Sequence, residues 1–383
     1  MLTDPGVHRV ALVRLRVGLG DLLCSEPALR LLRRARPDLH VTLVTWPEMA
    51  QVVDRVGHAD ELLPFPGAEG IPERTPDPGR WEAFVRRARE RRFDLAVQCY
   101  GNNPAANRVT AALGARRVGG FAPTGWEPAR DPELHLAYPH HLHEVWRHLR
   151  LVELLGVPLP AGETRADGAR APEAPAAQAR ADDAGAPFPV PLRFPIRPDD
   201  EAEVAAVLAQ HGLEPGTYAV LHPGASSPSR RWPPERFARV GDELAADGLR
   251  VVLTGVAGER ELVRAVAAAM RAPAIDLAGA TTLGGMAALL RAAAVVISND
   301  TGTAHLAAAV EAPSVTAFLP GDPVRWGHPS ARHQVARVDV DCNPCPHLLC
   351  PIDHRCATAV TPQLVLRRAR AALAAGRRTS AVP

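Results

Sequence analysis

The fold of this chain is decided near its start, where residues 10–21 read VALVRLRVGLGD. The apolar run Val10–Leu15, interrupted only by Arg14, predicts a buried strand, and a glycine turn then leads into a helical pattern over 22–35. A second strand is predicted over Val41–Trp46. Nearly continuous apolar strands that alternate with helices are typical of a parallel sheet covered on both faces. We therefore expect an α/β fold.

The same alternation begins again after residue 199. Strands are predicted over Tyr218–His222, Arg250–Thr254, Ala294–Ser298 and Ser314–Phe318, with helical patterns between them. The intervening residues 158–198 are rich in Pro, Ala, Gly and charge, so they cannot bury enough apolar surface to offset their ordering entropy. We predict an N-terminal domain over 1–160, a linker or surface loop over 161–198 and a C-terminal domain over 199–383.

The composition excludes several classes of protein. A net charge of +2 argues against a dedicated nucleic-acid-binding protein, which usually carries a strong basic excess. Arginine runs at 30–36 and 86–92 are interpreted as solvated helix faces, and a patch for peripheral contact with the inner membrane surface is the alternative. No apolar run of about 18 residues predicts a transmembrane helix, and no secretory signal is recognised. We expect a cytoplasmic protein.

The glycine turn after the first strand carries the first candidate catalytic residue. Gly18 and Gly20 permit a tight turn and close approach of the backbone to a ligand. A dinucleotide-binding fingerprint would need a small residue at position 23, where leucine stands, so that motif is excluded. Asp21 is expected at the carboxyl end of the strand, where doubly wound sheets bind ligands, and could accept a proton. A helix cap is the alternative, and the residues support both equally.

A second motif, HPGASSPSRRWP at 222–233, follows the first strand of the second series. Its loop carries two hydroxyls and two guanidinium groups, on Ser226, Ser227, Arg230 and Arg231. Because arginine pairs bidentately with phosphate oxygens, the loop is a candidate phosphate site. A surface loop with incidental arginines is the less favoured interpretation.

A third motif, SNDTGTAH at 298–305, joins a predicted strand to a predicted helix. Backbone N–H groups and hydroxyls at a helix start form an anion site suited to pyrophosphate. The candidate residues of this site are Asp300, Thr301, Gly302, Thr303 and His305. Aspartic proteases also contain Asp-Thr-Gly, but those proteins are all-β, whereas 304–309 is predicted to be helical here.

The fourth motif is a cluster of cysteines near the end of the chain. Cys342, Cys345, Cys350 and Cys356 lie within about fifteen residues and could form a structural zinc site, with His347 and His354 as spare ligands. Only one Cys-x-x-Cys pair is present, so free thiols or a redox-labile pair are the alternatives. A stable disulfide is disfavoured in the cytoplasm.

Together the first three motifs resemble glycosyltransferase family 9, the lipopolysaccharide heptosyltransferases. The resemblance is carried by the strand and turn at 10–21, the basic-x-Trp-Pro element at 230–233 and the Asn-Asp-Thr-Gly-x-x-His element at 299–305. These elements occur in the order of the family, and the resemblance covers most of the chain outside the linker. The family usually has lysine where this chain has Arg230.

The resemblance implies a GT-B fold, in which two Rossmann-like domains face each other across a cleft. It implies inverting transfer of a sugar, with heptose from ADP-heptose as the family's donor, to a hydroxyl of a lipopolysaccharide core or another cell-surface glycan. The acceptor would bind mainly the N-terminal domain, where Asp21 would be the catalytic base beside Gly18 and Gly20. The nucleotide sugar would bind the C-terminal domain, with Arg230 on phosphate and Glu259 on the ribose. No cofactor would be required.

Two other functions fit the same residues. One is a different nucleotide-sugar enzyme of the same fold, such as an epimerase or a transferase of another family. The other is a non-catalytic protein that binds nucleotide sugars. A glycoside product formed together with free nucleoside diphosphate would distinguish a transferase from both.

Overall fold

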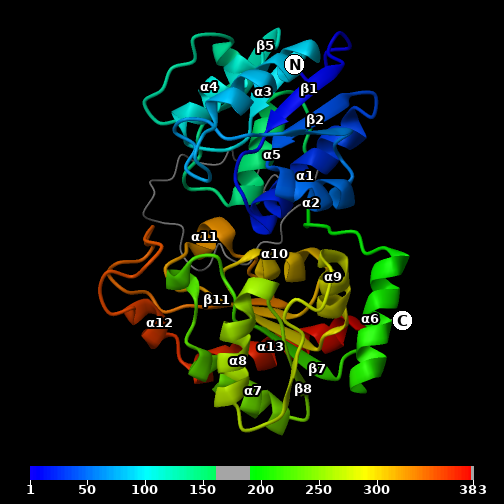
Figure 1. Ribbon diagram of the computed structural model, residues 1–383, viewed down its shortest axis with the longest axis vertical. Helices are drawn as coiled ribbons and strands as arrows, with labels where there is room; N and C mark the ends of the chain where they lie inside the picture. The colour runs from blue at the N-terminus through cyan, green and yellow to red at the C-terminus, as the bar shows by residue number, and fades with distance from the viewer. Residues whose placement is uncertain (161–189, 381–383) are drawn as a thin grey trace, which may run out of the picture. The chain divides into compact units, whose positions relative to one another are not determined.

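The computed structural model describes residues 1–160 and 190–380 (Figure 1). The chain divides into two compact units, Met1–Ala177 and Gln178–Pro383, each built around its own six-stranded sheet. Within the described ranges no helix is long and apolar enough to cross a membrane.

The linker predicted over 161–198 lies largely outside the described residues, so the predicted domain limits stay predictions. Its described end, residues 190–197, belongs to the second compact unit. This end differs from a bare surface loop because three of its apolar side chains are buried. They are Val190, Leu192 and Phe194.

The first unit is a doubly wound parallel sheet. Its strands are β1 (Arg9–Val13), β2 (His40–Thr45), β3 (Glu61–Pro64), β4 (Leu95–Gln98), β5 (Arg117–Ala122) and β6 (His135–Ala137). They lie in the order β3-β2-β1-β4-β5-β6 and all pairs are parallel. The chain therefore reverses its winding direction between β1 and β4. Ligands of such sheets bind beyond the carboxyl ends of the strands at this switch point.

Within the described residues of this unit, four α-helices connect these strands and a fifth, α5, follows β6. They are α1 (Leu19–Ala35), α2 (Ala50–Val56), α3 (Pro78–Glu90), α4 (Pro104–Ala112) and α5 (Glu144–Leu154), with short 3-10 turns η1 (Pro47–Met49) and η2 (Pro132–Leu134). Helix α1 packs against α5. It begins at Leu19, earlier than predicted, with Gly18 as its N-cap residue. Because Asp21 lies inside the first turn, the N-cap interpretation of Asp21 is wrong.

The second unit repeats the same topology. Its strands are β7 (Tyr218–His222), β8 (Arg250–Leu253), β9 (Ala274–Asp276), β10 (Val295–Asn299), β11 (Ser314–Ala317) and β12 (His333–Ala336). They lie in the order β12-β11-β10-β7-β8-β9, again all parallel, with the switch point between β7 and β10. The predicted α/β fold class is confirmed in both units.

The helices of the second unit cover this sheet and complete its core. They are α6 (Pro198–His211), α7 (Pro234–Ala246), α8 (Arg260–Ala269), α9 (Leu283–Ala292), α10 (Gly302–Ala309), α11 (Pro323–Trp326), α12 (Arg355–Ala359) and α13 (Pro362–Ser380), with 3-10 turns η4 (Pro228–Arg230) and η5 (Ala257–Glu259). The core consists mainly of Val, Leu and Ala side chains. Trp232 and Phe237, which pack edge to face, are its large aromatic members.

Candidate active site

Asp21 lies beyond the carboxyl end of β1, at the switch point of the first sheet. Its side chain is 22% exposed. Oδ1 faces two cations, at 3.4 Å from Arg14 Nη2 and 3.8 Å from Arg16 Nε. Oδ2 lies over Gly18, where an added Cβ would come within 2.8 Å of it. Among the described residues none donates a hydrogen bond to Oδ2, so this oxygen is open to a ligand.

Arg14 holds the backbone around Asp21 in place. Strand β1 ends at Val13, so Arg14 is the first residue beyond the strand, and it is only 1% exposed. Its guanidinium donates to the carbonyls of Cys99 (3.0 Å) and Tyr100 (3.2 Å), which follow β4. It also donates to the carbonyl of Asp21 at 2.9 Å. The two sides of the switch point are thereby joined through one buried cation.

The polar side chains of the loop between β7 and α7 have two roles. The Ser227 hydroxyl is buried and donates to the carbonyl of Leu348 at 3.0 Å, and Arg231 Nε donates to the carbonyl of Ala225 at 2.9 Å. These two predicted donor-binding residues therefore hold the loop in shape. Ser226 is exposed, and the side chain of Arg230 is 41% exposed. They are the members of the predicted set that face outward.

The loop between β10 and α10 meets the β7–α7 loop at Asn299. Its side chain is fully buried, accepts from the backbone N–H of Trp232 at 3.0 Å and donates to the carbonyl of Pro223 at 2.8 Å. Asn299 belongs to the third sequence motif, but the sequence did not predict that its side chain joins two loops. The neighbouring Asp300 carboxylate lies 3.7 Å from Arg230 Nη1.

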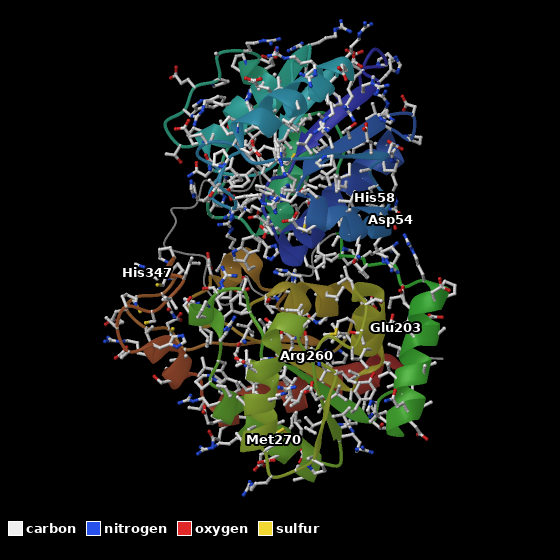
Figure 2. All side chains as sticks on the ribbon, in the orientation of Figure 1. Asp54, His58, Glu203, Arg260, Met270 and His347 are labelled. Atoms are coloured by element: carbon white, nitrogen blue, oxygen red, sulfur yellow. The ribbon has the colours of Figure 1, made fainter. Side chains whose placement is uncertain are left out.

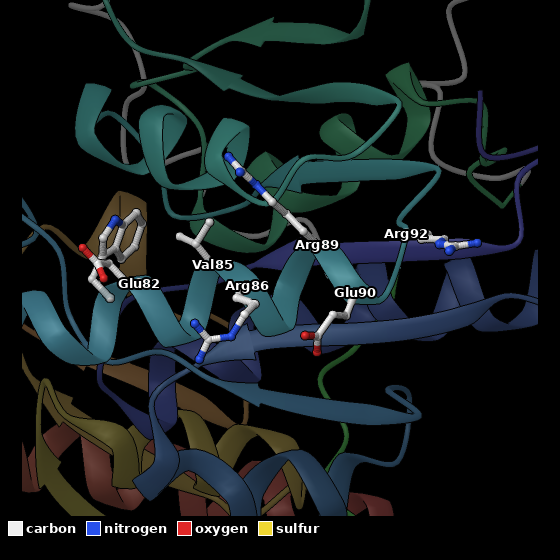
Figure 3. A pocket seen from close by; sticks show the side chains of 7 residues that line it. Glu82, Val85, Arg86, Arg89, Glu90 and Arg92 are labelled. Carbon is white, nitrogen blue, oxygen red and sulfur yellow. The ribbon is translucent and has the colours of Figure 1, made fainter.

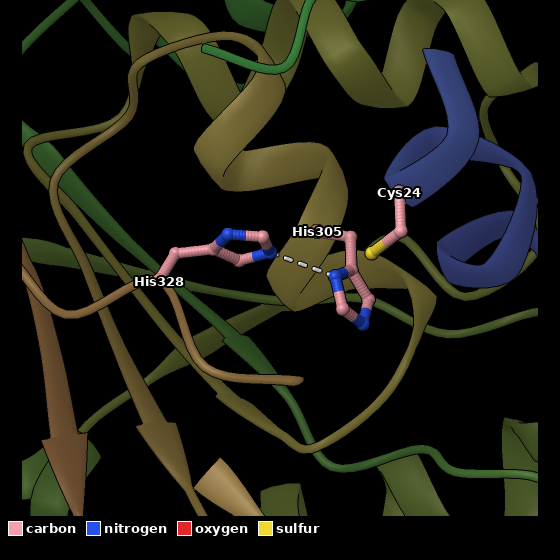
Figure 4. Close-up of side chains that lie close together, drawn as sticks. All are labelled: Cys24, His305 and His328. Carbon is pink, nitrogen blue, oxygen red and sulfur yellow. Dashed lines mark hydrogen bonds between the residues drawn. The ribbon is translucent and has the colours of Figure 1, made fainter. Parts of the chain in front are cut away.

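Other residues of the third motif lie at the start of α10. Thr301 is the N-cap residue of that helix and forms no side-chain capping bond. Thr303 is buried. His305 is also buried and shares a 2.8 Å hydrogen bond between its Nδ1 and Nε2 of His328 (Figure 4). His305 therefore braces α10 against the segment after β11.

Glu259 reaches the same end of the sheet from the β8–α8 connection. Its Oε2 accepts from the backbone N–H of Val256 at 2.9 Å and lies 3.9 Å from His222 Nε2. A Cβ on Gly224 would come within 2.2 Å of this oxygen, so glycine at 224 leaves room for the carboxylate. Glu259, Arg230 and Asp300 thus lie beyond the carboxyl ends of β8, β7 and β10 respectively, around the switch point of the second sheet.

His222, the last residue of β7, stays neutral near neutral pH. Burial lowers its pKa to about 4, although the nearby Glu259 carboxylate acts in the opposite direction. Its Nδ1 shares a 3.1 Å hydrogen bond with the Thr254 hydroxyl. His222 therefore adds no positive charge to the floor of this site.

The cysteine-rich loop packs against the loop between β7 and α7. The backbone N–H of Ser229 donates to the carbonyl of Leu348 at 3.0 Å, and its hydroxyl donates to the carbonyl of His347 at 2.7 Å. Figure 2 labels His347 in the cysteine-rich loop. His354 Nε2 lies 2.7 Å from the carbonyl of Ser229. In the described part of the chain, no three ligand atoms from the four cysteines come within 4.8 Å of one another. The predicted zinc site stays a prediction.

The second arginine run begins on the outer face of α3 and continues past its end, where Arg91 and Arg92 follow Glu90. A shallow hollow of about 590 Å³ there is lined by this helix and Arg92 (Figure 3). Arg86, Arg87 and Arg89 are exposed, as expected of a solvated helix face. The first run differs, because Arg30 is buried and pairs with Glu26 at 2.8 Å, one turn earlier in α1. For Arg30 the prediction of a solvated face was wrong.

Comparison with known proteins gives the family of this chain. A family model described as glycosyltransferase family 9 (heptosyltransferase) matches residues 81–355. The chain belongs to glycosyltransferase family 9. It is 26% identical over 347 residues to lipopolysaccharide heptosyltransferase 1 of Pseudomonas aeruginosa, covering 88% of this chain and 86% of that protein. With lipopolysaccharide heptosyltransferase 2 of Salmonella typhimurium it shares 31% over 142 residues, which spans only 36% of this chain and 41% of the relative.

Solved structures of other proteins share the fold of this chain. A family 9 glycosyl transferase from Veillonella parvula matches with a TM-score of 0.74 at 21% identity, over 96% of this chain and 98% of that one. An E. coli heptosyltransferase solved with ADP-2-deoxy-2-fluoro heptose matches with a TM-score of 0.59 at 21% identity, over 97% and 100%. The predicted GT-B fold of two Rossmann-like domains is confirmed.

The lowered pKa of His222 predicts how stability depends on pH. Between pH 6.5 and about 4 the unfolded chain binds a proton at this position that the folded chain does not, so stability falls as the pH falls. His222→Gln should reduce this slope by up to about 1.4 kcal/mol per pH unit. Burial lowers the pKa of His333 to about 4 as well, so part of the slope should remain.

Urea unfolding at several pH values measures this slope. His141→Gln is the matched control, because His141 is solvent-exposed in the first unit and its loss should leave the slope unchanged. An equal slope in wild type and His222→Gln would contradict the assigned burial effect.

Proposed function

We propose that this chain is an inverting glycosyltransferase that moves a sugar from a nucleoside diphosphate sugar to an acceptor hydroxyl. The observation that carries the proposal is the Asp21 carboxylate at the switch point of the first sheet, with one oxygen held toward arginines and the other open. The second switch point supplies complementary chemistry, a cation at Arg230 beside a helix start. Membership of glycosyltransferase family 9 supports the same assignment.

We propose ADP-heptose as the donor. A structurally similar E. coli heptosyltransferase was solved with ADP-2-deoxy-2-fluoro heptose. In this chain Glu259 would accept hydrogen bonds from the ribose hydroxyls, and Arg230 would pair with the diphosphate. The N–H groups at the start of α10 would meet the same diphosphate. The acceptor would be a lipopolysaccharide core or another cell-surface glycan, reached from the cytoplasm by peripheral contact with the membrane.

In the proposed reaction the acceptor oxygen attacks the anomeric carbon while Asp21 Oδ2 takes its proton. The bond from that carbon to the diphosphate oxygen breaks, and the nucleoside diphosphate leaves with the electron pair. Arg230 stabilises the growing negative charge. A helix start contributes only about 0.3–1 kcal/mol at exposed sites, so it would not replace the arginine. The residues named here perform each step without a metal.

The first prediction of the proposed function concerns Asp21→Asn. Asparagine has nearly the same shape but cannot act as a carboxylate base, so turnover should fall by about 10²–10⁴-fold. Affinity for ADP should stay unchanged, since the proposed donor contacts lie in the second unit. Turnover is followed by ADP release with ADP-heptose and a heptose-free lipopolysaccharide core, and the melting temperature is measured on the same preparation.

Near-normal turnover in Asp21→Asn would remove this residue from the mechanism. A large drop in melting temperature would instead assign the carboxylate to neutralising Arg14 and Arg16. Formation of a glycoside together with ADP by the wild type excludes an epimerase and a non-catalytic binding protein.

A second prediction concerns the donor. Arg230→Ala should weaken ADP binding by about tenfold to a hundredfold, the range expected when one charged hydrogen-bonding partner is removed. Calorimetry with ADP measures this affinity. Arg239→Ala is the matched control, because Arg239 is an exposed arginine on α7 of the same unit. Equal affinity in the two variants would argue against a phosphate role for Arg230.

A third prediction concerns the four cysteines, which we propose hold one structural zinc ion. Elemental analysis of protein purified without chelators should find about one zinc per chain. Cys345→Ser should lose that metal, whereas Cys99→Ser, in the first unit, should retain it. The zinc site would be refuted if metal-free wild-type protein melts at the same temperature as protein purified without chelators.

A further inference from the structure

A buried cluster of charges lies directly behind Asp21. Glu144, the first residue of α5, is 1% exposed, and Arg147, one turn later, is 2% exposed. Glu144 Oε1 lies 3.4 Å from Arg14 Nη2, and its Oε2 lies 3.1 Å from Arg147 Nη1. Removing such charges from water carries a desolvation penalty that ion pairing often does not recover. Packing alone would be served by apolar residues, so the cluster points to a role in the site.

Glu144 and Asp21 both lie near the same guanidinium nitrogen of Arg14, so the two carboxylates compete for it. Arg14 Nη2 lies at the same 3.4 Å from Asp21 Oδ1 and from Glu144 Oε1. Arginine and a carboxylate preferentially form two parallel hydrogen bonds. Here Arg14 forms no such paired contact with Asp21, because its Nη1 donates to the carbonyls of Cys99 and Tyr100. Glu144 and these carbonyls hold the guanidinium where it reaches only one oxygen of Asp21.

Arg147 and His148 are the remaining members of the cluster, and they show that Glu144 is its negative charge. Arg147 donates to the carbonyl of His140 at 2.6 Å and to the Tyr138 hydroxyl, so its position is also held. Burial lowers the pKa of His148, and Arg14 adds to this effect, so this histidine is neutral near neutral pH. Glu144 is thus the carboxylate that two buried arginines, Arg14 and Arg147, share.

The other elements packed around Asp21 contribute Arg16 and Tyr100. Burial lowers the pKa of Arg16, but Asp21, Tyr100 and Glu144 raise it by more, so the residue remains charged. Burial raises the pKa of Tyr100 to about 12, and its hydroxyl lies 2.9 Å from Glu73 Oε1. Tyr100 is therefore neutral. Among the described residues, Arg14 and Arg16 lie 3.4 and 3.8 Å from Asp21 Oδ1, and Glu144 lies 3.4 Å from Arg14.

We propose that Glu144 is a positioning residue that prevents Arg14 from pairing fully with Asp21. By attracting the Arg14 guanidinium it keeps Oδ2 of Asp21 open, and by its charge it limits the positive field on that carboxylate. This inference rests on the proposed function of Asp21 as the base. Glu144 acts through Arg14 and does not itself touch the substrate.

Opposite shifts in the pH profile distinguish this role from a structural one. In Glu144→Gln, Arg14 can pair with Asp21, and the unbalanced cation favours the charged carboxylate. The acid limb of kcat/KM should move to lower pH and kcat should fall about tenfold, part of the effect of a positioned base. In Arg14→Gln the carboxylate loses a neighbouring cation, so the acid limb should move to higher pH by about one unit.

The experiment uses the full chain with ADP-heptose and a heptose-free lipopolysaccharide core, and follows ADP release between pH 4 and 9. Glu26→Gln is the matched control, since Glu26 is equally buried, lies on α1 and pairs with Arg30 at 2.8 Å. It should lower the melting temperature and leave the acid limb in place. ADP affinity should equal that of wild type in all three variants.

Glu144→Asp covers the case in which Glu144→Gln does not fold, because it keeps the charge and shortens the side chain. It should lower kcat with the acid limb unmoved, while Arg14→Gln still moves the limb upward. An unmoved limb in Glu144→Gln, or an unmoved limb in Arg14→Gln, would overturn the inference. A wild type without ADP release, or an active Asp21→Asn, would instead overturn the proposed function on which it rests.

Discussion

Both sheets depend on one constraint: where the winding direction reverses, backbone polar groups at the strand ends need partners. In the first unit the buried guanidinium of Arg14 supplies them, joining the carbonyls of Cys99 and Tyr100 to the first turn of α1. In the second unit the buried amide of Asn299 joins the loops that follow β7 and β10. Because buried polar groups are costly when unpaired, these two side chains shape the surface on which any ligand must bind.

Three glycines that follow strands make room for carboxylates. Gly18 lies against Asp21, Gly224 against Glu259 and Gly321 against Asp300, and a Cβ at each position would come within 2.8, 2.2 and 2.2 Å of a carboxylate oxygen. The three glycines are therefore required by contact with acidic side chains. A phosphate-binding interpretation alone would explain these glycines by the close approach of the backbone to a ligand. Contact with a carboxylate explains them instead.

Apolar patterning located most of the second unit. Strand β7 was predicted with its observed bounds, because Tyr218–His222 is a continuous buried run between turn residues. Strands β5 and β6 were not predicted, since β5 contains two adjacent glycines and β6 has only three residues. Within the site, Ser227 and Arg231 are predicted to bind a ligand, and the structure adds that Ser227 Oγ and Arg231 Nε hold the loop. A sequence lists donors and acceptors, and only packing shows which are already paired.

Strand periodicity and short motifs are local properties, so they were enough to predict the α/β fold, the family and the position of Asp21 after the first strand. The residues that surround Asp21 are brought together by tertiary contacts. Glu144 lies 130 residues beyond Arg14 in the chain and is the first residue of a helix. From the sequence alone, an acidic side chain at that position would be interpreted as stabilising the helix dipole. Its burial between two arginines follows from the packing of α5 on α1, a long-range contact that no local pattern encodes.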